Sequence, residues 1–330
     1  MSLARLDWTQ RNEVIASGAH WRLRDYAGDD RARPLLIIAA PIKRPYIWDL
    51  APSISTIRFC LRRGLSIQLL EWMPASSRAG NNGLDEYTLA ISEAVATIAT
   101  AAQGAKPFLI GHSLGGTLAA IYAAFLPESI RGLVLLGAPL CFEPSANQFR
   151  DALVTLVPRE ICDTDPFPGS LLSHASALAS PRTFIWSRLM DAAMSSADPL
   201  AMEIHARVER WALDEVPLPG KLVHQIINLL YRENRFCQRH FEDWGKGYRP
   251  FQSVGPNTGG RQYRRRDCPS EFNQAFRGCN AEKRPGHWIP WRTWCLLTTS
   301  RHSGGTSRTS PCMAGNRILA EVFIKRHGKG

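Results

Sequence analysis

Short apolar runs that alternate with amphipathic helical stretches constrain the fold of this chain most strongly. Four runs have the length and composition of strands buried on both faces of a sheet, namely residues 34–39, 65–70, 107–110 and 130–136. Helical patterns separate them, at residues 54–63, 84–101 and 114–125. Strands that alternate with helices of this length predict a doubly wound, mostly parallel α/β sheet with right-handed crossovers.

The remaining sequence divides the chain into five parts. We predict an N-terminal segment at 1–33, an α/β core at 34–140, a helical cap at 141–216, a return to the core at 217–235 and a tail at 236–330. The strand signal stops in the predicted cap, where helical stretches carry aromatic, proline and methionine residues. Only eight Ile, Leu and Val residues occur in the last 95 residues, without periodicity, so we expect an irregular, disordered tail there.

The charge of the chain is concentrated in that tail. Residues 1–235 carry 23 basic and 23 acidic side chains, and the tail carries the remaining 17 basic and 6 acidic ones, which is the whole net charge of +11. A basic arm that binds RNA or DNA through Arg264, Arg265 and Arg266 and neighbouring aromatic rings is therefore one reading. We favour the interpretation that the tail is out of frame, under which no nucleic acid is expected as a partner.

One turn of the predicted core carries the chemistry. The sequence Gly111-His-Ser-Leu-Gly115 follows a predicted strand and opens a predicted helix, which is the context that a G-x-S-x-G nucleophile elbow requires. Gly111 and Gly115 leave room for a tight turn that exposes the Ser113 hydroxyl. The Leu114 N–H at the helix start is one expected oxyanion donor, and we assign the second by position to Ile42, in the loop after the first core strand.

The same region resembles a known family. GHSLGGTLAAIYAAFLPESIRGLVLLGAP is similar to the elbow helix and following strand of the polyhydroxyalkanoate synthase branch of the α/β-hydrolase superfamily. Further similar stretches are PLLIIAAPIKRPYIWDL (34–50), GLSIQLLEW (64–72), the GLDEY of residues 83–87, and the residues Trp211, Asp214, Pro217, Pro219, Gly220, Leu230, Tyr231 and Asn234. The resemblance covers residues 34 to about 235 and implies an α/β-hydrolase fold and an acyl ester or polyester substrate.

The nucleophile departs from that family. The polymer synthases carry cysteine where this chain has Ser113, and Cys141 follows a different strand and cannot replace it. A thiolate forms a thioester suited to acyl transfer, whereas serine needs a strong positioned base and forms an ester that water usually releases. We therefore predict an esterase or depolymerase acting on hydroxyacyl esters, with an acyltransferase of the synthase kind as the alternative.

The residues that should complete the site have no place in the tail as written. An acid and then a histidine should follow the serine, each after a late apolar strand. Asp267 followed by His287 or His302 satisfies the order, but no apolar strand precedes Asp267, so we ascribe this order to chance. An inactive remnant that binds acyl ligands without turnover is thus a further alternative.

A one-base frameshift would explain the composition of the tail. When each codon is read one base later, residues 256–269 permit PTLAVVNTADEIAP, an apolar strand that ends in an aspartate. The same shift permits LQHLGILVGR from residue 297, which supplies a histidine in a small loop. We hypothesise a frameshift near residues 236–239, under which the basic charge says nothing about partners.

Cysteine spacing and the lack of long apolar runs give the remaining expectations. The eight cysteines form no CxxC pair and no zinc spacing, so we expect free thiols, no metal and no cofactor. Neither a signal peptide nor a run of about 20 apolar residues is present, so we expect a cytoplasmic protein without a membrane partner. A homo-oligomer is left open.

Overall fold

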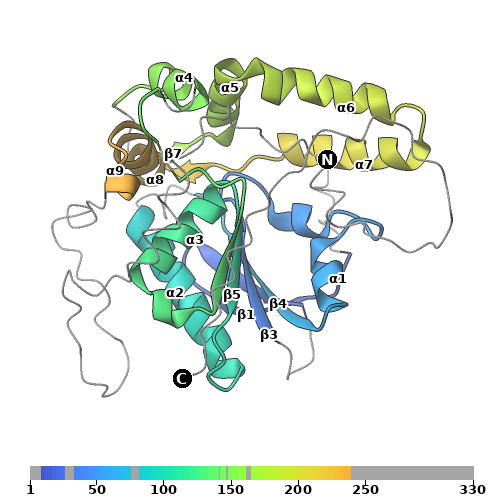
Figure 1. The fold of residues 1–330 in the computed structure, drawn as a ribbon, viewed down its shortest axis with the longest axis vertical. Coiled ribbons are helices and arrows are strands. Elements are labelled where there is room, and N and C mark those ends of the chain that lie inside the picture. Colours follow the sequence, from blue (N-terminus) through green and yellow to red (C-terminus); the bar gives the residue numbers. More distant parts are fainter. Residues whose placement is uncertain are drawn as a thin grey trace. The chain divides into compact units, whose positions relative to one another are not determined.

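The computed structural model describes residues 9–26, 33–75, 82–140, 142–145, 148–160 and 165–238. These residues belong to one compact unit (Figure 1). Nearly all of the predicted tail lies outside the described residues, so its predicted disorder and the frameshift hypothesis stay predictions. Among the described helices, none combines the length and apolarity needed to cross a bilayer.

A six-stranded, mostly parallel sheet forms the centre of the described fold, in the order β1-β2-β4-β3-β5-β6. Its strands are β1 (Glu13–Ser17), β2 (Trp21–Asp25), β3 (Arg33–Ile38), β4 (Leu65–Trp72), β5 (Phe108–His112) and β6 (Gly132–Leu136). The pairs β3–β4, β3–β5 and β5–β6 are parallel, whereas β1–β2 and β2–β4 are antiparallel. The predicted α/β fold class is thereby confirmed, and the four predicted runs correspond to β3, β4, β5 and β6.

The sheet begins upstream of the predicted core. The segment at 1–33 was expected to precede the core, but β1 and β2 form a hairpin that adds two strands to the sheet edge. Strand β2 is attached because Trp21 and Leu23, two residues apart, are both buried, while Arg24 pairs with Glu71 of β4 at 2.7 Å. Alternation over only a few residues is too short a pattern to predict such a strand.

Helices cover both faces of the sheet. Helix α1 (Thr56–Leu61) lies on the opposite side of the sheet from α2 (Leu84–Ala101) and α3 (Leu114–Phe125) in Figure 1. The predicted spans of α2 and α3 are confirmed to the residue. Short 3₁₀ turns follow β3 and α3, namely η1 (Pro45–Asp49) and η2 (Pro127–Ser129).

A group of helices follows β6 and lies near one end of the sheet in Figure 1. They are α4 (Gln148–Leu156), α5 (Gly169–Ala179), the π-helical η3 (Arg182–Trp186), α6 (Ser187–Ser195) and α7 (Pro199–Leu213). The two-residue strands β7 (Pro166–Phe167) and β8 (Leu218–Pro219) pair with each other. This helical region agrees with a cap in the predicted place, although the exact boundaries of the predicted cap stay predictions.

The chain then returns to the core through α8 (Gly220–Gln225), the π-helical η4 (Ile226–Arg232) and α9 (Arg235–Gln238). Gln225 accepts a hydrogen bond from the Leu84 N–H at 2.7 Å and so helps to cap α2. Asn234, at a φ of 48°, accepts one from the Phe142 N–H at 2.9 Å. These long-range contacts fix the return segment to the start of α2 and to the chain just after β6.

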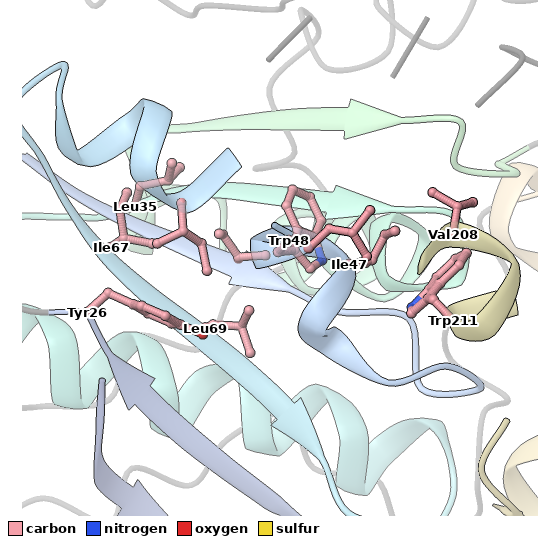
Figure 2. Close-up of a cluster of buried hydrophobic side chains, with 11 residues drawn as sticks. Tyr26, Leu35, Ile47, Trp48, Ile67, Leu69, Val208 and Trp211 are labelled. Atoms are coloured by element: carbon pink, nitrogen blue, oxygen red, sulfur yellow. The ribbon is translucent and has the colours of Figure 1, made fainter. Parts of the chain in front are cut away.

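One buried hydrophobic cluster joins the sheet to the last cap helix. Figure 2 shows Tyr26, Leu35, Ile67 and Leu69 from the sheet region together with Ile47 and Trp48 of η1 and Val208 and Trp211 of α7. Trp48 is fully buried and Trp211 nearly so. Burying side chains of this size contributes about 1.5–3 kcal/mol each, so α7 is held firmly against the segment that follows β3.

Candidate active site

Ser113 occupies the junction between β5 and α3, as the sequence predicts. Its backbone has φ 53° and ψ −131°, a conformation that residues with a Cβ atom rarely adopt. Such strain persists only where the surroundings enforce it, and it clusters at functional sites. Here the Ser113 N–H donates to the Leu136 carbonyl at 2.9 Å, which ties the turn to the end of β6. The geometry is that of a nucleophile elbow.

Close backbone packing explains the glycines of the motif. A Cβ atom on Gly111 would lie 2.5 Å from the Gly116 Cα, and one on Gly115 would lie 2.4 Å from the Ile38 carbonyl oxygen. Both distances are far below van der Waals contact, and the obstructing atoms belong to the backbone. The two glycines therefore allow the start of α3 to pack directly on β5 and on the end of β3.

Two further residues of the elbow were not singled out from the sequence. A Cβ atom on Gly116 would lie 2.5 Å from the Ala138 Cβ, so this glycine brings α3 against the chain that follows β6. The fully buried Thr117 donates its hydroxyl to the Pro139 carbonyl at 2.8 Å. The second glycine of GHSLGG is a sequence signal for Gly116, because glycine permits a close approach of the backbone to its neighbours.

The two predicted oxyanion donors belong to the start of α3 and to the turn after β3. Leu114 is the first residue of α3, where the N–H has no acceptor within the helix. Ile42 lies in a turn closed by a hydrogen bond from the Lys43 N–H to the Ala40 carbonyl at 3.3 Å. This turn directly follows Ala39, whose carbonyl a Gly115 side chain would strike, so it begins next to the start of α3. The roles of Leu114 and Ile42 as donors stay predictions.

His112 does not have the properties of a catalytic base. Burial lowers the pKa of this side chain from 6.5 to about 4, which leaves it neutral at pH 7 but a weak base. It is also the last residue of β5, immediately before Ser113 in the strand. We therefore interpret it as a packing residue beside the elbow.

The acid and the histidine expected after Ser113 should each follow a late strand, and the described residues contain no strand of the sheet beyond β6. No described strand pairs with the outer edge of β6. All five β6 residues are only half-buried, although four of them are Leu or Val. Asp267, His287 and His302 all lie outside the described residues.

Comparison with known proteins agrees with the fold and the resemblance. Residues 73–169, which include the elbow, match the family model of the alpha/beta hydrolase fold. The poly(3-hydroxyalkanoate) polymerase subunit PhaC of Haloferax mediterranei is 27% identical over 71% of this chain and 49% of its own length. The PhaC subunit of Allochromatium vinosum is 28% identical over 62% of this chain and 58% of its own length.

These matches cover only part of the relatives. The chain spans about half the length of the curated relatives that it matches. Among solved structures, the thioesterase domain from the curacin biosynthetic pathway is similar over 69% of this chain and 78% of that chain, at 15% identity and a TM-score of 0.38.

Proposed function

We propose that this chain, a polyhydroxyalkanoate synthase-like α/β-hydrolase, uses Ser113 as the nucleophile of acyl-ester chemistry. The observation that carries the proposal is the strained backbone of Ser113 at the strand–helix junction, enforced by glycines that admit no side chain. The Oγ atom would attack the ester carbonyl, and the Leu114 and Ile42 N–H groups would stabilise the tetrahedral oxyanion. One such donor typically supplies about 3 kcal/mol of transition-state stabilisation.

The substrate that we propose is a hydroxyacyl ester or a polyester of hydroxyacyl units. The names of the relatives support this class, since they describe polymerases of 3-hydroxyalkanoates. Serine favours hydrolysis: collapse of the oxyanion expels the alcohol and leaves an acyl-serine ester, which water then cleaves to the free acid. Acyl transfer to another alcohol is the second candidate, and the similarity to polymerases favours it.

Turnover needs a general base, and we propose that the frame-restored chain supplies it. In the shifted frame, an apolar strand ending in an aspartate and a later loop with a histidine follow in the required order. The half-buried apolar strand β6, with an outer edge that the described strands leave unpaired, supports a further strand at that position. Sequencing the gene across codons 230–245 tests the frameshift directly. The proposal predicts one missing or extra base there, and an intact reading frame would contradict it.

A turnover measurement separates the candidates. The frame-restored chain is incubated with a short 3-hydroxyacyl ester and a soluble alcohol acceptor, and the free acid and the new ester are quantified. We expect mainly free acid, and none of it from Ser113→Ala. A dominant ester product would favour the transferase, and equal rates for Ser113→Ala would remove Ser113 from the mechanism.

Cytoplasmic location and the absence of nucleic-acid and membrane partners remain proposals. Homo-oligomerisation gains support from large apolar side chains that are exposed on the cap helices, including Leu171, Leu178, Trp186, Leu189, Met190, Met194, Leu200 and Leu213. Light scattering of the full chain measures its oligomeric state.

Binding of a labelled DNA duplex tests the proposal about nucleic acid. No binding at low or high salt would agree with our reading of the tail, whereas binding that weakens steeply with salt would favour the basic-arm alternative.

A further inference from the structure

The turn that carries Ile42 is closed by one hydrogen bond of its own. In residues 40–43, which we call the oxyanion turn, the Lys43 N–H donates to the Ala40 carbonyl at 3.3 Å. A turn of this kind uses the N–H of its last residue and leaves the N–H of Ile42, the second central residue, without a partner inside the turn. An unpaired N–H suits an oxyanion donor, but a single long hydrogen bond does not fix its direction.

The chain that leaves the cap makes further contacts that fix the oxyanion turn. Residues 211–216, which we call the cap-exit segment, run antiparallel to the oxyanion turn, with Glu215 opposite Lys43. The Val216 N–H donates to the Ile42 carbonyl at 3.2 Å. This bond fixes the peptide plane that follows Ile42, directly beside the N–H that would face the substrate.

Side chains reinforce the backbone contact. The Lys43 Nζ lies 2.7 Å from a carboxylate oxygen of Glu215 and also donates to the Ala212 carbonyl. The Trp211 Nε1–H donates to the Arg44 carbonyl at 2.7 Å, and Arg44 lies 3.7 Å from Asp214. Every residue from Ile42 to Arg44 is therefore held by the cap-exit segment.

Burial makes these contacts hard to replace by water. The side chains of Lys43 and Glu215 are only 16% and 13% exposed. Desolvation lowers the pKa of Lys43, and Glu215 opposes that shift, so the ammonium depends on its carboxylate partner. Removing one partner of such a pair leaves a buried charge without compensation.

We propose that the cap-exit segment positions the oxyanion turn, with Glu215 and Trp211 as positioning residues for the Ile42 N–H. The cap then acts on the chemistry, because a shift of α7 reaches the Ile42 N–H through these contacts. The inference rests on the proposed function, since it presupposes that Ile42 serves Ser113.

Hydrogen exchange of the full chain tests the contact without requiring turnover. Mass spectrometry follows the Lys43 and Val216 amides, which donate to the Ala40 and Ile42 carbonyls, in Glu215→Gln and in Trp211→Phe, which keeps an aromatic ring but loses the N–H donor. We expect exchange at least about 10-fold faster in both variants. The matched control is Glu71→Gln, since Glu71 pairs with Arg24 at the same 2.7 Å and with similar burial but within the sheet. Unchanged exchange in the first two variants, or an equal rise in the control, would overturn the proposal.

A labelling rate connects the contact to chemistry. Even without a base, an oxyanion hole and substrate binding leave a residual acceleration of about 10³–10⁴ over water, so slow reaction of Ser113 with a fluorophosphonate reports on the donors. We expect Glu215→Gln and Trp211→Phe to lower this rate about 10-fold relative to the unmodified chain, and Glu71→Gln to leave it within about 2-fold. Equal rates would overturn the positioning role while Ser113 remains the nucleophile. Absence of Ser113 labelling from the folded, frame-restored chain would instead overturn the proposed function and the positioning role with it.

Discussion

Replacing Ser113 by glycine should leave the protein more stable than replacing it by alanine, because the elbow is strained. At φ 53° and ψ −131° a residue with a Cβ atom incurs about 1–3 kcal/mol of backbone strain. Glycine avoids that strain but loses about 0.5–1 kcal/mol through the greater freedom of its unfolded chain. The net expectation is that Ser113→Gly exceeds Ser113→Ala in free energy of unfolding by about 0.5–2 kcal/mol.

The alanine variant is the necessary reference, because it also removes the hydroxyl yet keeps the Cβ atom and therefore the strain. Urea unfolding followed by circular dichroism gives both free energies, and thermal unfolding should show a midpoint about 1–8 °C higher for glycine in a domain of this size. If the glycine variant proves no more stable than the alanine variant, the elbow is not strained. The principal support for Ser113 as the nucleophile would then be lost.

Two further predictions concern the surroundings of the elbow. Gly115→Ala should destabilise the fold by about 1–3 kcal/mol or more, measured by urea unfolding, because its Cβ would lie 2.4 Å from a backbone oxygen of β3; Gly132→Ala, which meets only the Phe108 ring at 3.1 Å, should cost less, and equal costs would contradict the packing. The low pKa of His112 means that the unfolded chain binds a proton which the folded protein rejects between pH 6.5 and about 4. Stability should therefore fall as pH drops through this range, by up to about 3 kcal/mol, and a pH series of unfolding midpoints should be flatter for His112→Gln. A wild-type series as flat as the variant's would contradict that pKa.

The sequence predicted the parallel strands and their helices well because each is a local pattern. Strands β3 and β5 each contain a continuous apolar run, and α2 and α3 have sustained amphipathic or small-residue periodicity and clear ends. The hairpin of β1 and β2 was not predicted, since β1 is mostly exposed and has no alternation. Its place in the sheet depends on pairing with β4 more than 40 residues away, which no local pattern encodes.

In the candidate site, too, only the local features could be predicted from the sequence. The elbow could be predicted because G-x-S-x-G, its preceding strand and its following helix are adjacent in the chain. The contacts of Lys43 with Glu215 and of Ile42 with Val216 could not, because they join residues more than 170 positions apart and involve residue types that are common on surfaces. Packing of α7 onto η1 brings them together.

Reaction of Ser113 with a fluorophosphonate tests the central claim most directly. The full chain and its frame-restored form are treated with the probe, and the modified residue is identified by peptide mass spectrometry. The account predicts stoichiometric labelling of the frame-restored chain at Ser113, slower labelling of the chain as written by several orders of magnitude, and none in Ser113→Ala. A folded, frame-restored chain that stays unlabelled at Ser113, or is labelled elsewhere, would contradict the claim that this elbow carries an active nucleophile.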